Sequence, residues 1–161
     1  MGRRTRLARE LETLYRRRYE RFLRVASAIV GDEASAHDAV QDGFARALKA
    51  LGTFSGDGAL EGWVWRIVVN AALAGRDARP TQAELHDDLV GFDENGADET
   101  GVRAWVASLP ERQRIAVFLR YYADLDYRGI AAALGIEVGT VSATLSAAHS
   151  ALRRSLQEVE R

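Results

Sequence analysis

The sequence predicts an all-α protein made of two small helical domains joined by a flexible acidic linker. Apolar residues recur at helical spacing in both halves of the chain. Residues that begin or end helices stand where that spacing stops. Between the halves, residues 81–101 contain seven acidic residues and no basic one, a composition that buries little and repels itself. We therefore expect domains at 1–79 and 102–161 and a linker at 80–101.

The first domain is expected to hold three helices that close one small core. The first helix ends at Gly31, and the second begins at Ser35 with Asp38 as a capping-box-like partner. A glycine-rich loop, TFSGDG, leads to a third helix from Leu60 to about Gly75. The apolar stripes expected to form the core are Leu7, Leu11, Leu14, Phe22, Ala26 and Ile29, then Val40, Phe44, Ala47, Leu48 and Leu51, then Leu60, Trp63, Val64, Ile67, Val68 and Ala71.

The second domain contains the spacing of a helix-turn-helix. A short helix is expected over 102–107, and Pro110 stands near the first turn of the next helix, where its missing N–H is harmless. Further on, small Ala131 allows close approach of two helices, Gly135 makes the turn, and Val141 fixes the second helix. The apolar stripe expected on that second helix is Val141, Leu145, Ala148, Leu152 and Leu156.

Composition narrows the functional classes. The chain has no cysteine, no apolar run long enough to span a bilayer and no signal-peptide core at its start, which favours a cytoplasmic protein without membrane insertion. The three histidines, His37, His86 and His149, show no metal-ligand spacing, and GDG at 56–58 is not followed by the Lys-Ser/Thr of a phosphate loop. We expect no enzymatic activity, no metal and no cofactor.

Two segments together resemble one family. They are HDAVQDGFARALKALGTFSGDGALEGWVWRIVVN, residues 37–70, and LPERQRIAVFLRYYADLDYRGIAAALGIEVGTV, residues 109–141. In this order and spacing they resemble bacterial RNA polymerase sigma factors of the extracytoplasmic-function (ECF) type in the sigma-70 family. The resemblance implies region 2 over 1–79 and region 4 over 102–161. It also implies three partners: core RNA polymerase, through its large-subunit clamp helices and flap, promoter DNA, and an anti-sigma factor.

The resemblance assigns roles within the first domain. The residues matching the clamp-docking helix are Asp38, Val40, Gln41, Asp42 and Phe44. Those matching the segment that captures an extruded base of the −10 element are Phe54, Ser55, Gly56, Asp57, Trp65, Arg66 and Asn70. Such a base needs a pocket and stacking to offset its lost neighbours. For Val40 and Phe44, burial in the core is at least as good an interpretation as docking. Arg66 could equally contact a phosphate or pair with a carboxylate. We expect Trp63 in the core and Trp65 exposed.

The −35 recognition helix departs from the family. Its expected contacts are Thr140, Ser142, Ala143, Thr144, Ser146 and His149. Family members commonly carry basic residues at the positions held here by Ser142, Thr144, Ala147 and His149, yet no Lys or Arg occurs from 129 to 152. Fewer neutralised phosphates weaken DNA binding and its salt dependence. The sequence therefore predicts a −35 contact that is weak, unusual in sequence or helped by another protein, with most of the specificity carried by −10 recognition and polymerase docking.

Two further readings stay open at this stage. The chain could be a free-standing helix-turn-helix regulator or a sigma-like interaction module without promoter recognition of its own. The arginines of the first helix, Arg16, Arg17, Arg18, Arg21 and Arg24, are read either as a solvated face or as contacts to promoter phosphates or polymerase.

Overall fold

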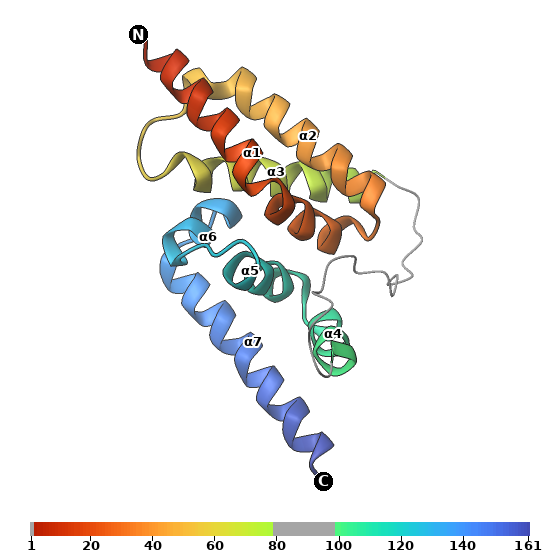
Figure 1. The fold of residues 1–161 in the computed structure, drawn as a ribbon. Helices are drawn as coiled ribbons and strands as arrows, with labels where there is room; N and C mark the ends of the chain where they lie inside the picture. The colour runs from red at the N-terminus through yellow and green to blue at the C-terminus, as the bar shows by residue number, and fades with distance from the viewer. Residues whose placement is uncertain (1, 79–98) are drawn as a thin grey trace.

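The computed structural model describes residues 2–78 and 99–161, and every regular element in those ranges is a helix. The first half contains α1 (Arg3–Val30), α2 (Glu33–Ala50), the 3-10 turn η1 (Leu51–Thr53) and α3 (Leu60–Asp77). The second half contains α4 (Glu99–Ser108), α5 (Glu111–Tyr121), α6 (Tyr127–Leu134) and α7 (Val138–Val159). Figure 1 shows α1–α3 as one bundle, with α5–α7 beneath it. The predicted all-α fold class is confirmed.

The core of the first bundle is built on aromatic contacts among its three helices. Phe22 of α1 stacks on Trp65 of α3 with ring centroids 3.8 Å apart, and meets Phe44 of α2 edge-on at 4.9 Å. Helices α2 and α3 come closest at Gly43, where an added Cβ would lie 2.7 Å from Val68 Cγ2 and 2.9 Å from Val68 Cα. Glycine at position 43 therefore sets the distance between these two helices.

The junction between α1 and α2 is a tight turn, stabilised by hydrogen bonds to backbone groups at the ends of both helices. Gly31 adopts φ +89° and donates its N–H to Ser27 O at 2.8 Å, as expected of a glycine that ends a helix. The next helix is capped by Asp32, whose carboxylate accepts from Ser35 N at 2.8 Å. The expected cap at Ser35 with Asp38 is therefore wrong, because Asp32 already satisfies the free N–H groups one turn earlier.

The second half contains the expected helix-turn-helix. Helices α6 and α7 meet at a bend of 100°, within the range typical of the motif. Gly135 supplies the left-handed turn at φ +65° and donates its N–H to Ala131 O, while Val141 is fully buried. Asp126 caps α6 by accepting from Gly129 N at 2.7 Å. Pro110 immediately precedes α5, as the sequence predicted.

Three expected details differ from the structure. Leu48 is 50 % exposed and Leu156 is 55 % exposed, because α2 has no neighbour on its outer side and the last turns of α7 extend beyond α5 and α6 (Figure 1). Helix α4 begins at Glu99, three residues before the predicted start. The predicted linker, 80–101, otherwise lies outside the described residues. The domain limits at 79 and 102 stay a prediction.

The two halves contact one another directly, which the sequence did not indicate. Helix α6 packs along α3, and α5 packs against α1. No single helix in the described ranges is long and apolar enough to cross a membrane; α6 and α7 reach that threshold only when joined across their 100° bend. The helix-turn-helix thus lies against the first bundle, and this arrangement determines which candidate residues are accessible.

Candidate functional site

The outer face of α2 presents the polar residues assigned to polymerase docking. Asp38, Gln41 and Asp42 are exposed on successive turns of one side of the helix. Val40 and Phe44 are buried and belong to the bundle core. The five residues therefore separate into an exposed polar set and a buried pair that holds the helix in place. We call the exposed set, with Leu48, the α2 face.

Leu48 belongs to this face although its spacing suggested a place in the core. It lies two turns after Gln41 and keeps half its surface exposed. An exposed leucine beside carboxylates and an amide is typical of a protein-binding surface, where a few apolar anchors lie within a polar rim. The signal available in the sequence was the pair Ala47–Leu48, of which only one member could face inward.

The loop between η1 and α3 holds the first residues assigned to the −10 element. Phe54 is buried against Trp63, with ring centroids 5.4 Å apart, and its carbonyl accepts a 2.5 Å hydrogen bond from Arg3 Nη2. Ser55, Gly56 and Asp57 are exposed. Asp57 N donates to Ser55 Oγ at 3.1 Å, and Gly56 has φ +90°, so the loop has a defined exposed tip on a buried phenylalanine.

The expected exposure of Trp65 is wrong. Trp65 is fully buried in the stack with Phe22, and its Nε1 donates to Glu61 Oε1 at 3.4 Å. Trp63 is instead half-buried and faces the loop at Phe54. The physical reason is that α3 has neighbours on several sides, namely α1, α2 and α6, so its buried arc is wider than a single stripe. Trp63, not Trp65, is the tryptophan that a nucleic-acid base could reach.

Arg66 and Asn70 lie one turn apart on the exposed side of α3. Asn70 is exposed to solvent. Arg66 lies against the turn of the helix-turn-helix: a Cβ added at Gly135 would be 3.2 Å from its Nη2 and 3.3 Å from its Cζ. The guanidinium therefore lies near Gly135, while Arg66 as a whole stays exposed.

The N-terminal half of helix α7 presents small, neutral side chains. Thr140, Ser142, Ala143 and Ser146 are exposed on the side away from Val141 and Leu145. Thr144 is half-buried and its hydroxyl donates to Thr140 O at 2.7 Å. Hydroxyl and methyl groups can contact phosphate oxygens, base edges or a thymine methyl, but they neutralise no phosphate charge.

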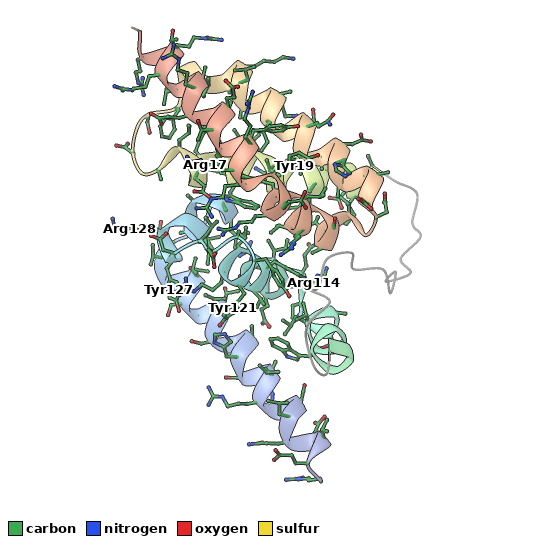
Figure 2. The ribbon with its side chains drawn as sticks, in the orientation of Figure 1. Arg17, Tyr19, Arg114, Tyr121, Tyr127 and Arg128 are labelled. Carbon is green, nitrogen blue, oxygen red and sulfur yellow. The ribbon has the colours of Figure 1, made fainter. Side chains whose placement is uncertain are left out.

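The histidines are used as packing and hydrogen-bonding groups. His149 on α7 shares a 2.7 Å hydrogen bond with the Tyr121 hydroxyl of α5, which is labelled in Figure 2. His37 shares a 2.5 Å hydrogen bond with Tyr19 of α1, and burial raises the pKa of that phenol. His86 lies outside the described residues. Among residues 2–78 and 99–161, no three His, Cys, Asp or Glu side chains come together as a metal site.

Positive charge near the helix-turn-helix comes from Arg128 of α6, a residue that was not among the expected DNA contacts. Arg128 is exposed at the start of α6, and Figure 2 shows it beside Tyr127 at the edge of the motif. Tyr127 lies under the Arg120 guanidinium, 5.9 Å from ring centroid to Cζ. The signal available in the sequence was a basic residue, Arg128, shortly before Ala131, where the small-residue spacing of the motif begins.

The arginines of α1 are largely engaged within the chain. Arg16 pairs with Glu12 at 2.8 Å, Arg18 approaches Glu61 at 4.0 Å, and Arg21 pairs with Asp124 at 3.2 Å. Arg17 and Arg24 are exposed. The predicted basic face is therefore narrower than the sequence suggested, because three of its five arginines already meet carboxylates.

Two family models match the chain, one in each half. Sigma-70 region 2 matches residues 14–78, and Sigma-70, region 4 matches residues 102–156. The RNA polymerase sigma-H factor of Pseudomonas aeruginosa is 31% identical, with 82% of this chain and 78% of that protein covered. The ECF RNA polymerase sigma-E factor of Escherichia coli (strain K12) is 32% identical, with 77% of this chain and 75% of that protein covered.

Solved structures with the same fold span nearly the whole chain. CnrH in complex with the cytosolic domain of CnrY superposes with a TM-score of 0.70 at 24% identity, covering 94% of this chain and 90% of that one. The sigma factor RpoE in complex with the anti-sigma factor NepR from Bartonella quintana superposes with a TM-score of 0.66 at 21% identity, covering 91% and 98%.

Proposed function

This chain belongs to the sigma-70 family as an ECF RNA polymerase sigma factor, which directs promoter-specific initiation of transcription, and we propose how its surfaces share that task. The α2 face binds the clamp helices of the polymerase large subunit. The loop tip and α3 read the −10 element. Helix α7 binds the −35 element weakly. The observation that carries this division is the exposure of Asp38, Gln41 and Asp42 on one face while Val40 and Phe44 are buried.

Two features of the loop before α3 support its binding to the −10 element, namely a buried phenylalanine that holds the loop and the exposed residues at its tip. Phe54 is buried and anchored, whereas Ser55, Gly56 and Asp57 project into solvent. Trp63 lies at the edge of this loop and offers part of its ring for stacking, a contact worth about 1–3 kcal/mol per base. Asn70, one turn after Arg66 on the exposed side of α3, offers an amide to the following nucleotides.

The shape of α7, more than its charge, supports contact of this helix with the −35 element. Helix α7 has the exposed hydroxyls and the buried Val141 of a recognition helix, but no Lys or Arg before Arg153. Arg128 on α6 and the N-terminal end of α7 are the positive groups nearest the duplex. Binding by α7 should therefore be weak and only mildly dependent on salt.

We propose further that the chain acts in the cytoplasm, without catalytic activity, metal or cofactor of its own, as an initiation factor of the polymerase. One relative in fold is held by an anti-sigma factor. We propose by analogy that this chain has a protein antagonist.

Transcription with purified core polymerase on a promoter library tests the proposal. We expect start-site-specific transcripts with the wild type. Replacing Asp38, Gln41 and Asp42 together by alanine should weaken core-polymerase binding at least about tenfold, the effect of about 1.4 kcal/mol. Replacing Glu20, an exposed acid on α1, by alanine is the matched control and should leave binding unchanged. Polymerase binding without any specific transcript would favour an interaction module instead.

A further inference from the structure

From Val138 to Leu152, helix α7 carries one ionisable side chain, the imidazole of His149. The exposed side chains of its first turns end in hydroxyl and methyl groups, which carry no charge at any ordinary pH. Histidine is the side chain that ordinarily changes its charge between about pH 5 and pH 8. The charge on this part of α7 therefore depends on the protonation of a single residue.

His149 lies at the distance from the start of α7 at which a recognition helix leaves the major groove. It follows Val138 by eleven residues, which at about 1.5 Å per residue is about 16 Å along the helix. The major groove is about 12 Å wide, and a recognition helix contacts base edges with its N-terminal residues. Later turns of such a helix lie beside the sugar-phosphate backbone. His149 also follows Ser142 and Ser146 at helical spacing, so these three side chains share one side of α7.

Tyr121 of α5 holds the imidazole of His149 in place. The Tyr121 hydroxyl and His149 Nε2 are 2.7 Å apart, and the two ring centroids are 6.0 Å apart (Tyr121 is labelled in Figure 2). A phenol hydroxyl can both donate and accept a hydrogen bond. With its proton on Nδ1, the neutral imidazole accepts from the Tyr121 hydroxyl, and the cation donates Nε2–H to the same oxygen. The ring thus keeps its partner in both charge states, and Nδ1–H is the group that can bind a phosphate oxygen.

No ion pair among the described residues involves His149, although α5 and α6 both pack against α7. The acids of those two helices and of the turn between them have other partners: Asp124 pairs with Arg21, Asp126 caps α6, and Glu111 pairs with Arg76. The cations near the Tyr121 contact in sequence, or one turn beyond His149 on α7, are Arg120, Arg128 and Arg153. A positive charge on His149 is therefore not offset within the chain, whereas a DNA phosphate would offset it.

We propose that His149 is the phosphate-binding residue of α7 and that it binds DNA as the imidazolium, so that contact with the −35 element takes up one proton from solvent. Tyr121 is its positioning residue. The inference rests on the proposed function, in particular on the assignment of α7 to the −35 element. The contact formed is a hydrogen bond from Nδ1–H to a phosphate oxygen, strengthened by the opposite charges. Promoter affinity consequently rises as pH falls, because the binding form is then more abundant.

Promoter binding at two pH values tests the proposal, with the full chain bound to core polymerase. The probe is a duplex that this complex selects from a promoter library. Relative to His149→Gln, wild-type binding should be at least about threefold tighter at about pH 6 than at about pH 8. The slope of log K against log salt should also steepen by up to about 0.9 at the lower pH, since one more phosphate is neutralised. Equal pH dependence in wild type and His149→Gln would overturn the inference.

Two further variants separate the charge of the imidazole from its position. His149→Lys carries its charge at both pH values, so its complex should bind the probe at about pH 8 at least about threefold more tightly than wild type. Tyr121→Phe keeps the ring and loses the hydroxyl, so it should weaken binding more at the lower pH, where the imidazolium is used. A His149→Lys complex no tighter than wild type would show that no phosphate lies within reach. Equal weakening by Tyr121→Phe at both pH values would contradict the positioning role.

The other two histidines provide matched controls. His37→Gln and His86→Gln remove the remaining imidazoles of the chain, and both variants should keep the wild-type pH dependence. Loss of the pH dependence in either of them would overturn the assignment to His149. Failure of the complex to select any promoter would refute the proposed function itself, whereas promoter selection without an effect of His149 refutes only the present inference.

Discussion

Replacing Gly43 by alanine should destabilise the protein, although alanine is the better helix former. The added Cβ would lie 2.7 Å from Val68 Cγ2 and 2.9 Å from Val68 Cα, and the second of these atoms is backbone. A rotamer change of Val68 cannot relieve a clash with its own Cα, so α2 and α3 must move apart. The contact between the helices that carry the α2 face and the −10 residues is thereby loosened.

The magnitude follows from two opposing contributions. Overpacking a core costs about 1–3 kcal/mol, and a backbone clash belongs at the upper end of that range. Alanine gains about 1 kcal/mol over glycine in a helix interior. The net loss in the free energy of unfolding is about 2 kcal/mol, which for a chain of this size corresponds to a fall in Tm of about 4–8 °C.

Gly75→Ala provides the matched control for this prediction. Gly75 also lies in a helix, α3, but no atom lies within 4 Å of its added Cβ. Only the propensity term remains, so Tm should rise by about 2–4 °C. Thermal and urea unfolding followed by far-UV circular dichroism measure both variants. A Gly43→Ala protein as stable as wild type would refute the steric reasoning.

Three further experiments test the core, the motif and the recognition helix. Trp65→Ala should cost about 3–5 kcal/mol of stability in urea unfolding, and Trp63→Ala clearly less, because only the first indole is fully buried; equal losses would contradict the assigned orientation of α3. Asp126→Ala should cost about 1 kcal/mol by removing the α6 cap, and Asp126→Asn should recover most of it. Ala147→Arg places a cation on the exposed side of α7 and should steepen the slope of log K against log salt for promoter binding by about 0.9 in the polymerase complex; an unchanged slope would show that α7 does not approach the phosphates.

The sequence predicts those features that depend on local chemistry. Gly31 ends α1 because it alone tolerates φ +89° there at no steric cost. The spacing of Ala131, Gly135 and Val141 predicts the helix-turn-helix because the turn and the close approach require small residues at fixed positions. The exposure of Asp38, Gln41 and Asp42 follows from helical periodicity in the same way, whereas that of Leu48 does not.

Features that depend on which helices are neighbours were not predictable. Trp65 appeared to leave the apolar stripe of α3, but α1, α2 and α6 surround that helix and bury adjacent positions on it. Leu156 continues an apolar stripe that no other described helix covers. The contact between α3 and α6 gave no signal in the sequence, since Gly62 and Ala132 are small residues that periodicity does not distinguish from any others. Periodicity gives the direction of a side chain relative to its own helix, whereas burial depends on the partner.

Helix α3 is packed on two sides by close contacts that leave no space for an added methyl group. On one side the backbone of Gly43 meets Val68, and on another side Gly62 meets Ala132. A displacement of α3 by a few tenths of an ångström therefore cannot be absorbed by a side-chain rotation at either contact.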